Sequence, residues 1–479
     1  MAGISNELSH FNGRNGLGAV MGSKNVKAIA VRGTSDVAVH DKETLQRLYR
    51  ETSELAHTQV QAHALNQFGT IAGVEGVNAG GALPTNNWQN AVFPGADKIG
   101  GKRLNEEFLV KRGACYMCPV RCKRVVAVPD PVYAVDSEYG GPEYETAIAF
   151  GSCCGVNSME VVIKANELCN RLTLDTISAG MTIAFAMACF EAGLLTKDDT
   201  GGIDLKFGNE HAILPLLEDM AHRRGLGAIL ADGSSAAAKK IGKGAERFLL
   251  TVKGQEIPMH DPRIKTGLGL QFALAPNGAD HWFAQHDPFF ATETSPGCIA
   301  LAQMGLGRPV APLSLGPDKV RIVAYTSYLN ALYDDLGVCV FAAVARSMTG
   351  LDTLTAMIRA VTGWDVSLWE LLKVGERTNT LYRLFNQKQG VNASADMLPG
   401  LFFKPFADGP LAGTQAIDQA EFEEAVRLYY AMCGWDPDTG HPTMGKLSEL
   451  GLEMYAGLPD ADSDVRRASR AAARADAHA

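Results

Sequence analysis

Cys115, Cys118 and Cys122 form a C-x2-C-x3-C array within eight residues. Cysteines at such spacing ligate zinc or an iron–sulfur cluster. A structural zinc site normally needs a second pair, and no second close pair of suitable spacing follows. An iron–sulfur cluster takes four thiolates, one of which is often remote in sequence. The array therefore predicts a metal centre, with an iron–sulfur cluster favoured and zinc, or reduced cysteines without metal, as alternatives.

The fourth thiolate must come from elsewhere in the chain. Cys339 is the best candidate because it ends the turn 334–339, which resembles the turn 170–175. Each turn follows a predicted helix and has an apolar residue just before its final Asp or Cys. Such a pair could hold the two halves of a pseudo-symmetric ligand through oxygens that accept hydrogen bonds from ring N–H groups. The residues alone leave three other cysteines open as the fourth ligand: Cys153, Cys154 and Cys298.

Cations and glycines near these segments could contact anionic groups. Basic side chains flank the array and would offset the charge of a cluster: Lys111, Arg112, Arg121, Lys123 and Arg124. The glycine-rich segment 12–24 suits close approach to a phosphate. It matches neither the P-loop nor the dinucleotide fingerprint, because a strand rather than a helix is predicted after it. A flexible turn before an edge strand at 26–32 is the alternative.

Two carboxylates and a histidine are candidates for proton transfer. Glu143 and Glu145 lie near the start of a predicted helix, where they could cap it or handle a proton. His281 follows Asp280 in a loop rich in Gly, Asn and Asp, with a second histidine at 286. A hydrogen-bonded surface role is the alternative for His281.

Composition limits the class of protein. The chain has 479 residues, which predicts two or three domains, and its net charge of −9 argues against a nucleic-acid-binding role. Ten cysteines with this distribution do not form a disulfide framework, so a cytoplasmic location is expected. The sequence shows neither an export signal nor an apolar run long enough to span a membrane.

Helical periodicity dominates the chain. Helices are predicted at 41–67 with Asp41 as N-cap, at 158–171, at 177–192 after an N-cap at 175–176, and at 319–333, 367–385, 421–432 and 446–455. The helix at 177–192 is apolar on nearly all sides, so it should be central and buried. These helices must place the array, the two turns and the carboxylates beside one another.

Taken together, these segments resemble the tungsten-dependent aldehyde ferredoxin oxidoreductases. The order and spacing match over nearly the whole chain. Besides the array, the resemblance rests on Gly13–Lys24, Glu143–Thr146, Leu174–Ser178, Lys253–Arg263, Asp334–Cys339, Gly375–Arg377, Leu384–Asn386 and Gly434–Trp435.

The resemblance implies a set of cofactors and ligands. A 4Fe-4S cluster would lie on Cys115, Cys118, Cys122 and Cys339, beside tungsten (or molybdenum) held by two pterins. The turns match the family's pterin-binding motifs, the second well and the first with Asn170 and Thr173 in place of Asp and Gly. Residues matching pterin contacts are Arg14, Asn15, Asn170, Asp175, Asp334 and Gly337. Glu143 or Glu145, and His281, match the region of the family's proton-handling residues, and the resemblance does not decide which glutamate.

The expected fold is mainly α, with two helical domains of this family's type and a short N-terminal β/loop remnant. The expected divisions are 1–38 for the remnant, 39–250 for the helical domain with the array, 251–459 for the helical domain with the fourth ligand, and 460–479 for a disordered tail. The family has an N-terminal β domain on which the pterins sit, and residues 1–38 match only its final loop and strand. A mis-assigned start, a separate β-domain polypeptide or a gene remnant would each explain this.

The expected reaction is oxidation of an aldehyde to a carboxylic acid. A glutamate or His281 would take the proton, and electrons would leave singly through the cluster to ferredoxin or a similar acceptor. Two alternatives stay open: an iron–sulfur electron-transfer subunit without a complete metal–pterin site, and a zinc-stapled helical scaffold. A homo-oligomer is compatible with this assignment.

Overall fold

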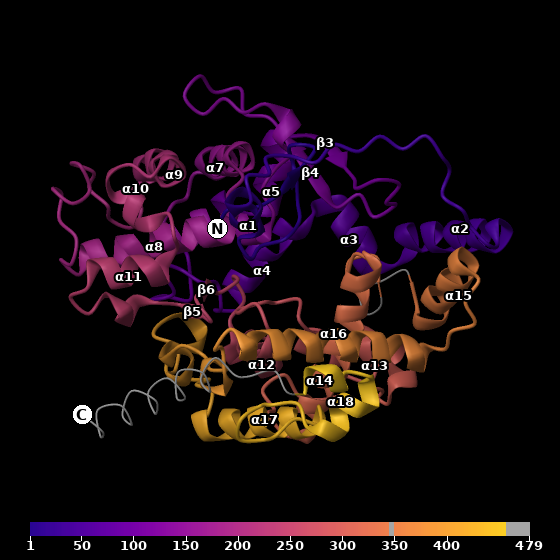
Figure 1. Ribbon diagram of the computed structural model, residues 1–479. Coiled ribbons are helices and arrows are strands. Elements are labelled where there is room, and N and C mark those ends of the chain that lie inside the picture. Colours follow the sequence, from indigo (N-terminus) through magenta and orange to yellow (C-terminus); the bar gives the residue numbers. More distant parts are fainter. Residues whose placement is uncertain (344–348, 457–479) are drawn as a thin grey trace, which may run out of the picture.

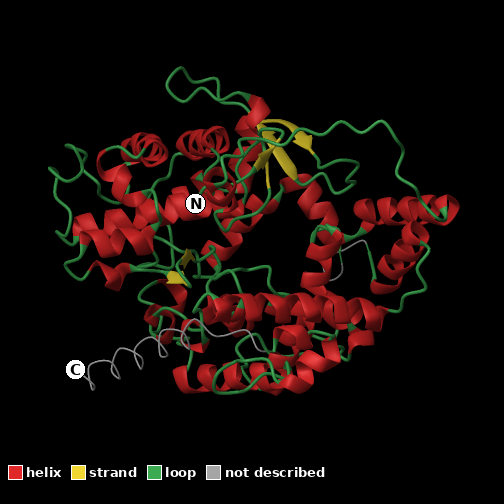
Figure 2. Cartoon of the chain, viewed as in Figure 1, coloured by secondary structure: helices red, strands yellow, loops and turns green. Residues whose placement is uncertain are grey.

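The computed structural model describes residues 1–343 and 349–456 and confirms the mainly α fold. Figure 2 shows that helices make up most of this part of the chain. The helices of the first half are α1 (Leu17–Ser23), α2 (Lys42–Thr58), α3 (Val60–Phe68), α4 (Gly73–Ala79), α5 (Gly101–Arg103), α6 (Tyr144–Phe150), α7 (Met159–Leu172), α8 (Thr176–Glu191), α9 (Ile213–His222), α10 (Gly225–Leu230) and α11 (Ser234–Ile241). Those of the second half are α12 (Thr266–Leu274), α13 (Pro296–Ala300), α14 (Pro317–Leu336), α15 (Leu351–Thr362), α16 (Leu368–Lys388), α17 (Gln419–Met432) and α18 (Met444–Leu450).

Three antiparallel hairpins make up the sheets of the described residues. Their strands are β1 (Ser5–Asn6) with β2 (His10–Phe11), β3 (Leu109–Gly113) with β4 (Lys123–Val126), and β5 (Thr251–Val252) with β6 (Gln255–Glu256). In the β3–β4 hairpin, Arg112 pairs with Arg124 and Gly113 with Lys123. The nine residues between these strands carry the cysteine array, so the hairpin fixes both ends of that loop.

Helix α8 lies at the centre of the first half of the chain. Asp175 caps it by accepting a hydrogen bond from the N–H of Ile177, as the sequence predicts. Every residue from Ile177 to Cys189 is buried, because α6, α11 and neighbouring segments surround the helix. Figure 1 shows α8 among α7, α9, α10 and α11, in the magenta part of the chain. This buried helix fixes the turn that precedes it.

Helices α14 and α16 organise the second half. The two pack side by side, with α17 and α12 against α14, and they form the lower layer in Figure 1. Ser367 and Glu370 form a capping box at the start of α16. Helix α14 ends where Gly337 takes a left-handed conformation with φ of 67°. Because glycine adopts this conformation without a Cβ clash, the chain turns sharply there and continues to Cys339.

The prediction of a strand at 26–32 is wrong. The segment is extended, but residues 27–39 form no backbone hydrogen bond with any described part of the chain. Ile29, Val31 and Val37 are 79%, 89% and 80% exposed. A strand requires a neighbouring strand to pair with its N–H and C=O groups, and no such neighbour lies beside this segment among the described residues.

The domain divisions remain predictions. The largest cluster of buried residues includes side chains from both sides of residue 250, such as Phe185 and Phe272. The tail expected at 460–479 lies outside the described residues. Within the described part of the chain, none of the helices combines the length and apolar character needed to cross a membrane.

Candidate active site

The cysteine array lies in the loop between β3 and β4. Cys115 is exposed, whereas Cys118 and Cys122 are half-buried and pack beside Val120 with Ala342. Ala342 is three residues after Cys339, so the end of α14 reaches the array. The thiols of Cys339 and Cys122 are also close enough to influence one another electrostatically. The structure therefore brings together all four cysteines of the expected ligand set.

The other candidates for the fourth ligand lie elsewhere. Cys153 and Cys154 are buried in the main core, where their thiols donate to the carbonyls of Pro84 and Ala149. Cys298 is buried in a second core cluster with Phe290 and Leu301. All three thiols are thus buried in core clusters other than the one that contains Cys118 and Cys122.

A cavity of about 690 Å³ adjoins the array. Its wall includes Ala114, next to the first cysteine, and both Asn170 and Asp175 of the first turn. Six basic side chains line it: Arg14, Lys111, Arg112, Arg121, Lys123 and Arg124. So many cations around one cavity favour an anionic ligand, and phosphate groups suit guanidinium forks. The donor set thus fits a cofactor that carries phosphates.

Arg14 links the N-terminal glycine-rich loop to helix α8. Its Nε donates to the Asp175 carboxylate at 2.8 Å, and its Nη atoms donate to the Ser178 hydroxyl and to the Glu256 carbonyl. Burial opposes both charges, yet Arg14 and the hydrogen bonds from Ser178 and from the N–H of Ile177 still lower the pKa of Asp175. The ion pair therefore holds an ionised carboxylate at the cavity wall.

The remaining predicted cofactor contacts lie in separate places. Asn170, at the cavity wall, donates to the Tyr139 carbonyl at 2.7 Å. Asn15 has a φ of 75° and accepts a hydrogen bond from Asn277. Asp334 and Gly337 are exposed at the end of α14 and do not line this cavity. Arg14, Asn170 and Asp175 thus lie in one wall of the cavity, whereas the second turn, 334–339, lies beside the cysteine array.

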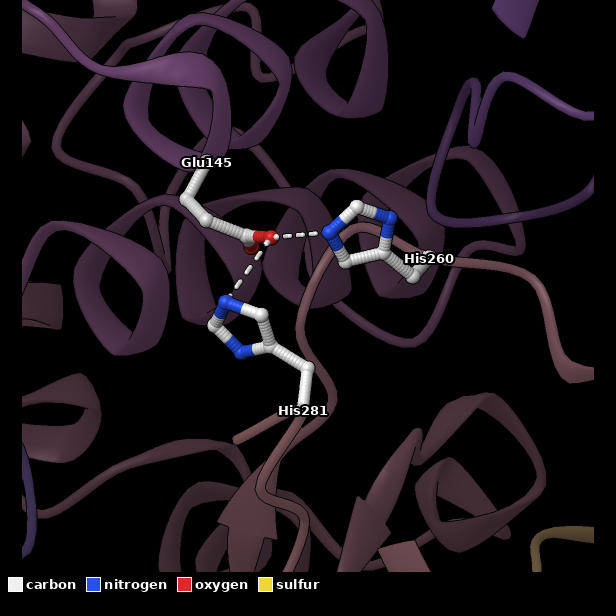
Figure 3. Close-up of side chains that lie close together, drawn as sticks. All are labelled: Glu145, His260 and His281. Carbon is white, nitrogen blue, oxygen red and sulfur yellow. Dashed lines mark ion pairs between the residues drawn. The ribbon is translucent and has the colours of Figure 1, made fainter. Parts of the chain in front are cut away.

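Glu145 lies where two histidines converge. Its Oε1 is 3.2 Å from Nε2 of His260 and 3.8 Å from Nε2 of His281. Figure 3 shows both imidazole rings pointing at this carboxylate. The other oxygen, Oε2, accepts a hydrogen bond from the N–H of Met259 at 2.8 Å. The cluster is mostly shielded, since 14% of the Glu145 side chain is exposed.

Burial raises the pKa of Glu145 to about 7 from an ordinary value of 4.5. The N–H of Met259 and the cations Arg14 and Lys265 act in the opposite direction, but they only partly offset the loss of solvation. A carboxylate that titrates near neutral pH can both accept and release a proton under physiological conditions. Glu145 also lines the cavity, so this group faces the expected cofactor.

Glu143 is outside this cluster. It accepts a hydrogen bond from Thr70 and pairs with Lys123 at 3.3 Å. The two glutamates are separated by one residue at the start of α6, so their side chains leave the helix in different directions. Of the two candidates, the geometry brings only Glu145 to His281.

His260 was not predicted as a site residue. The ring stacks on Tyr144 with centroids 4.9 Å apart, and its Nδ1 is 3.2 Å from Nζ of Lys265. The one sequence signal for His260 was its position inside Lys253–Arg263, a segment on which the family resemblance rests. Its contact with Glu145 joins residues 115 positions apart, and no local pattern in the sequence indicates such a contact.

The ligand atoms of Glu145, His260 and His281 lie within 4.8 Å of one another, a spacing that also suits a metal ion. A metal-bound imidazole normally donates its other N–H to a carboxylate or carbonyl. Here the neighbour of His260 Nδ1 is an ammonium group, which cannot accept that hydrogen bond. The surroundings therefore favour proton transfer over metal binding at these three residues.

A cysteine array beside a cation-lined cavity, with a carboxyl group of raised pKa in the cavity wall, is the arrangement of a cofactor-dependent redox enzyme. Comparison with protein families gives two matches: "Aldehyde ferredoxin oxidoreductase, domains 2 & 3" over residues 44–452, and the N-terminal domain of the same family over residues 1–33. The chain therefore belongs to the aldehyde ferredoxin oxidoreductase family, and it is an oxidoreductase.

Individual relatives agree with this assignment. The chain is 36% identical over 460 residues to a tungsten-containing aldehyde ferredoxin oxidoreductase of Pyrococcus horikoshii, covering 95% of this chain and 71% of that protein. A subunit of an aliphatic sulfonate oxidoreductase of Pyrococcus furiosus is 28% identical, with 94% and 68% covered. Among solved structures, the active-site complex BamBC of benzoyl coenzyme A reductase matches with a TM-score of 0.74 at 20% identity, covering 98% of this chain and 73% of that one. That last likeness concerns the fold alone.

Proposed function

We propose that the chain oxidises an aldehyde to the corresponding carboxylic acid and passes the electrons singly to ferredoxin or a similar acceptor. The observation that carries this proposal is the position of Glu145, which lines the cation-rich cavity and faces two imidazoles. The relatives' names supply the substrate class, since the P. horikoshii protein is a tungsten-containing aldehyde ferredoxin oxidoreductase. Because oxidation of an aldehyde with water releases two protons and two electrons, the site needs a base and an electron exit.

The chain's residues divide these tasks. A tungsten (or molybdenum) bis-pterin bound in the cavity would supply the two-electron chemistry. Arg14, Asn170 and Asp175 would hold its polar groups, and Cys115, Cys118, Cys122 and Cys339 would ligate a 4Fe-4S cluster at the adjoining loop. In this arrangement the cluster lies next to the cavity, which gives electrons a short route outward.

Glu145 would take the proton that the reaction releases. At neutral pH a carboxyl group with a pKa of about 7 is ionised in roughly half of the molecules, so it can accept a proton and then lose it without a large barrier. His281 lies 3.8 Å from Glu145 Oε1, where it can orient the carboxylate toward the cavity. The shielded position of Glu145 limits the access of bulk water to the reacting group.

The test is aldehyde-dependent reduction of ferredoxin by anaerobically prepared enzyme. Glu145→Gln keeps the side-chain shape but removes the base, and we expect the rate to fall by about 100-fold or more. Glu143→Gln is the competing variant, and we expect a much smaller loss. A larger loss for Glu143→Gln would assign the proton to the other glutamate, and an unchanged rate for both would contradict the proposal.

A second candidate is an iron–sulfur electron-transfer subunit whose metal–pterin site is completed by a separate β-domain polypeptide. The observation that favours it is the extended segment 27–39, whose exposed Ile29, Val31 and Val37 suit pairing with an additional β-strand. Purification under low salt, followed by identification of bound polypeptides, distinguishes the two. A stoichiometric β-rich partner would favour the second candidate.

The proposed compartment is the cytoplasm. All ten cysteines lie in the described part of the chain and all are free thiols. Thiols that must stay reduced to ligate a cluster are compatible with a reducing compartment.

A further inference from the structure

Lys265, His260 and Glu145 form a continuous chain of polar contacts. Nζ of Lys265 is 3.2 Å from Nδ1 of His260, and Nε2 of the same ring is 3.2 Å from Oε1 of Glu145. Lys265 precedes α12, whereas Glu145 lies in the first turn of α6. The imidazole therefore connects a cation on one segment to the carboxylate on another.

The chemistry of these groups fixes the direction of the hydrogen bonds. An ammonium group has only donors, so His260 Nδ1 must be the acceptor. An imidazolium has no acceptor nitrogen, so this contact requires a neutral ring. The single ring proton then lies on Nε2, the atom that faces Oε1 of Glu145 at 3.2 Å. The other oxygen, Oε2, accepts a hydrogen bond from the N–H of Met259 at 2.8 Å.

We propose that Lys265 and His260 are positioning residues: Lys265 keeps the His260 ring neutral with its proton on Nε2, and His260 thereby leaves Glu145 as the group that accepts the substrate's proton. The inference rests on the proposed function of Glu145 and deepens it. A His260 ring in this state has no free nitrogen for a proton from Glu145. His281, at 3.8 Å, makes the longer of the two imidazole contacts with that oxygen.

The surroundings hold the ring in this orientation. Tyr144 stacks on His260 with an interplanar angle of 16°, and its hydroxyl donates to the Met259 carbonyl at 3.0 Å. His286 meets the same ring edge-on at 5.2 Å between centroids. His281, Arg14, Asp175 and Cys153 are further titratable or charged groups that act on this cluster. Stacking by Tyr144 restricts the ring plane, so the two nitrogens stay aimed at Lys265 and Glu145.

The tautomer of His260 can be measured directly in the cofactor-free chain. In protein labelled with ¹⁵N at its histidines, the two ring nitrogens of each of the 11 residues give signals that distinguish Nδ1–H, Nε2–H and imidazolium forms. His260→Gln identifies the His260 signals. We expect the Nε2–H form at neutral pH in the wild-type chain. An Nδ1–H form or an imidazolium would overturn the proposal, whatever the catalytic activity proves to be.

Two substitutions at Lys265 test its role. Lys265→Met removes the donor but keeps the length of the side chain, and we expect the fixed Nε2–H signal of His260 to be lost. Lys265→Arg keeps a cationic donor, and we expect that signal to be retained. In cofactor-loaded enzyme, the acid limb of kcat/KM against pH should move to higher pH in Lys265→Met and return toward wild type in Lys265→Arg. An unchanged His260 spectrum in a folded Lys265→Met chain would contradict the assignment.

Discussion

Glu145→Gln should make the protein more stable at neutral pH, although it removes the carboxylate that we propose as the catalytic base. The pKa of Glu145 is raised by burial from 4.5 to about 7, which means that folding disfavours the ionised form. With each pKa unit worth about 1.4 kcal/mol, ionising this buried carboxylate costs about 3 kcal/mol of folding free energy. Glutamine has a similar shape, can still accept from the N–H of Met259 and never ionises.

The sign and the pH window follow from the two pKa values. Below about pH 4.5 the carboxyl group is neutral in both folded and unfolded chains, so Glu and Gln should differ little. Between 4.5 and about 7 the unfolded chain ionises more readily, so the wild type loses stability as pH rises. Above pH 7 the difference should level off at about 3 kcal/mol in favour of Glu145→Gln, and near pH 5 it should be only about 1 kcal/mol.

Urea unfolding of the cofactor-free chain at about pH 5 and about pH 8 measures this difference. Titrations that occur in both proteins cancel when the variant is compared with the wild type at each pH. Glu143→Gln is the matched control, because it removes the 3.3 Å ion pair with Lys123 and should lower stability rather than raise it. A Glu145→Gln chain that is less stable than wild type at pH 8, or a gain that does not depend on pH, would refute the reasoning.

Further predictions concern the cluster ligands and the elements that position the site. Cys339→Ala should lower the iron content of anaerobically prepared protein, whereas Cys298→Ala should retain it; the reverse pattern would exclude Cys339 as a ligand. Arg14→Met leaves the Asp175 carboxylate buried without its partner, so unfolding free energy should fall by about 3 kcal/mol at neutral pH, and less at acidic pH as Asp175 is protonated; an equal loss at all pH values would contradict the role of the ion pair. Ser367→Ala removes the capping box of α16 and should cost about 1 kcal/mol, while Ser367→Asn, which keeps an acceptor, should cost less; equal losses in urea unfolding would show that the cap does not stabilise α16.

Local signals predicted much of the fold. Asp175 caps α8 in the structure as the sequence predicts, because capping depends on residues within one turn. The helix predicted at 319–333 is α14, which runs to Leu336 and ends at Gly337. The apolar run of α8 correctly indicated a central helix. The segment 26–32 shows the limit of such reasoning, because alternation describes a strand's side chains but not the partner strand that would complete it.

The candidate site was likewise predicted only in part from the sequence. The array could be read from the spacing of Cys115, Cys118 and Cys122 alone. To choose between Glu143 and Glu145, one must know the direction in which each side chain leaves α6. To find His260, one must know that residues 255–265 pack against α6, a contact across more than a hundred residues. Long-range contacts of this kind depend on the whole fold, so the proton-accepting cluster could be only partly predicted.

The most direct test of the central claim is the metal content of the anaerobically purified protein. The proposed redox site predicts about four iron atoms per chain together with tungsten or molybdenum, and loss of that iron in Cys339→Ala. Iron without tungsten or molybdenum would reduce the chain to an electron-transfer subunit. A colourless preparation that contains zinc and no iron would contradict the account altogether.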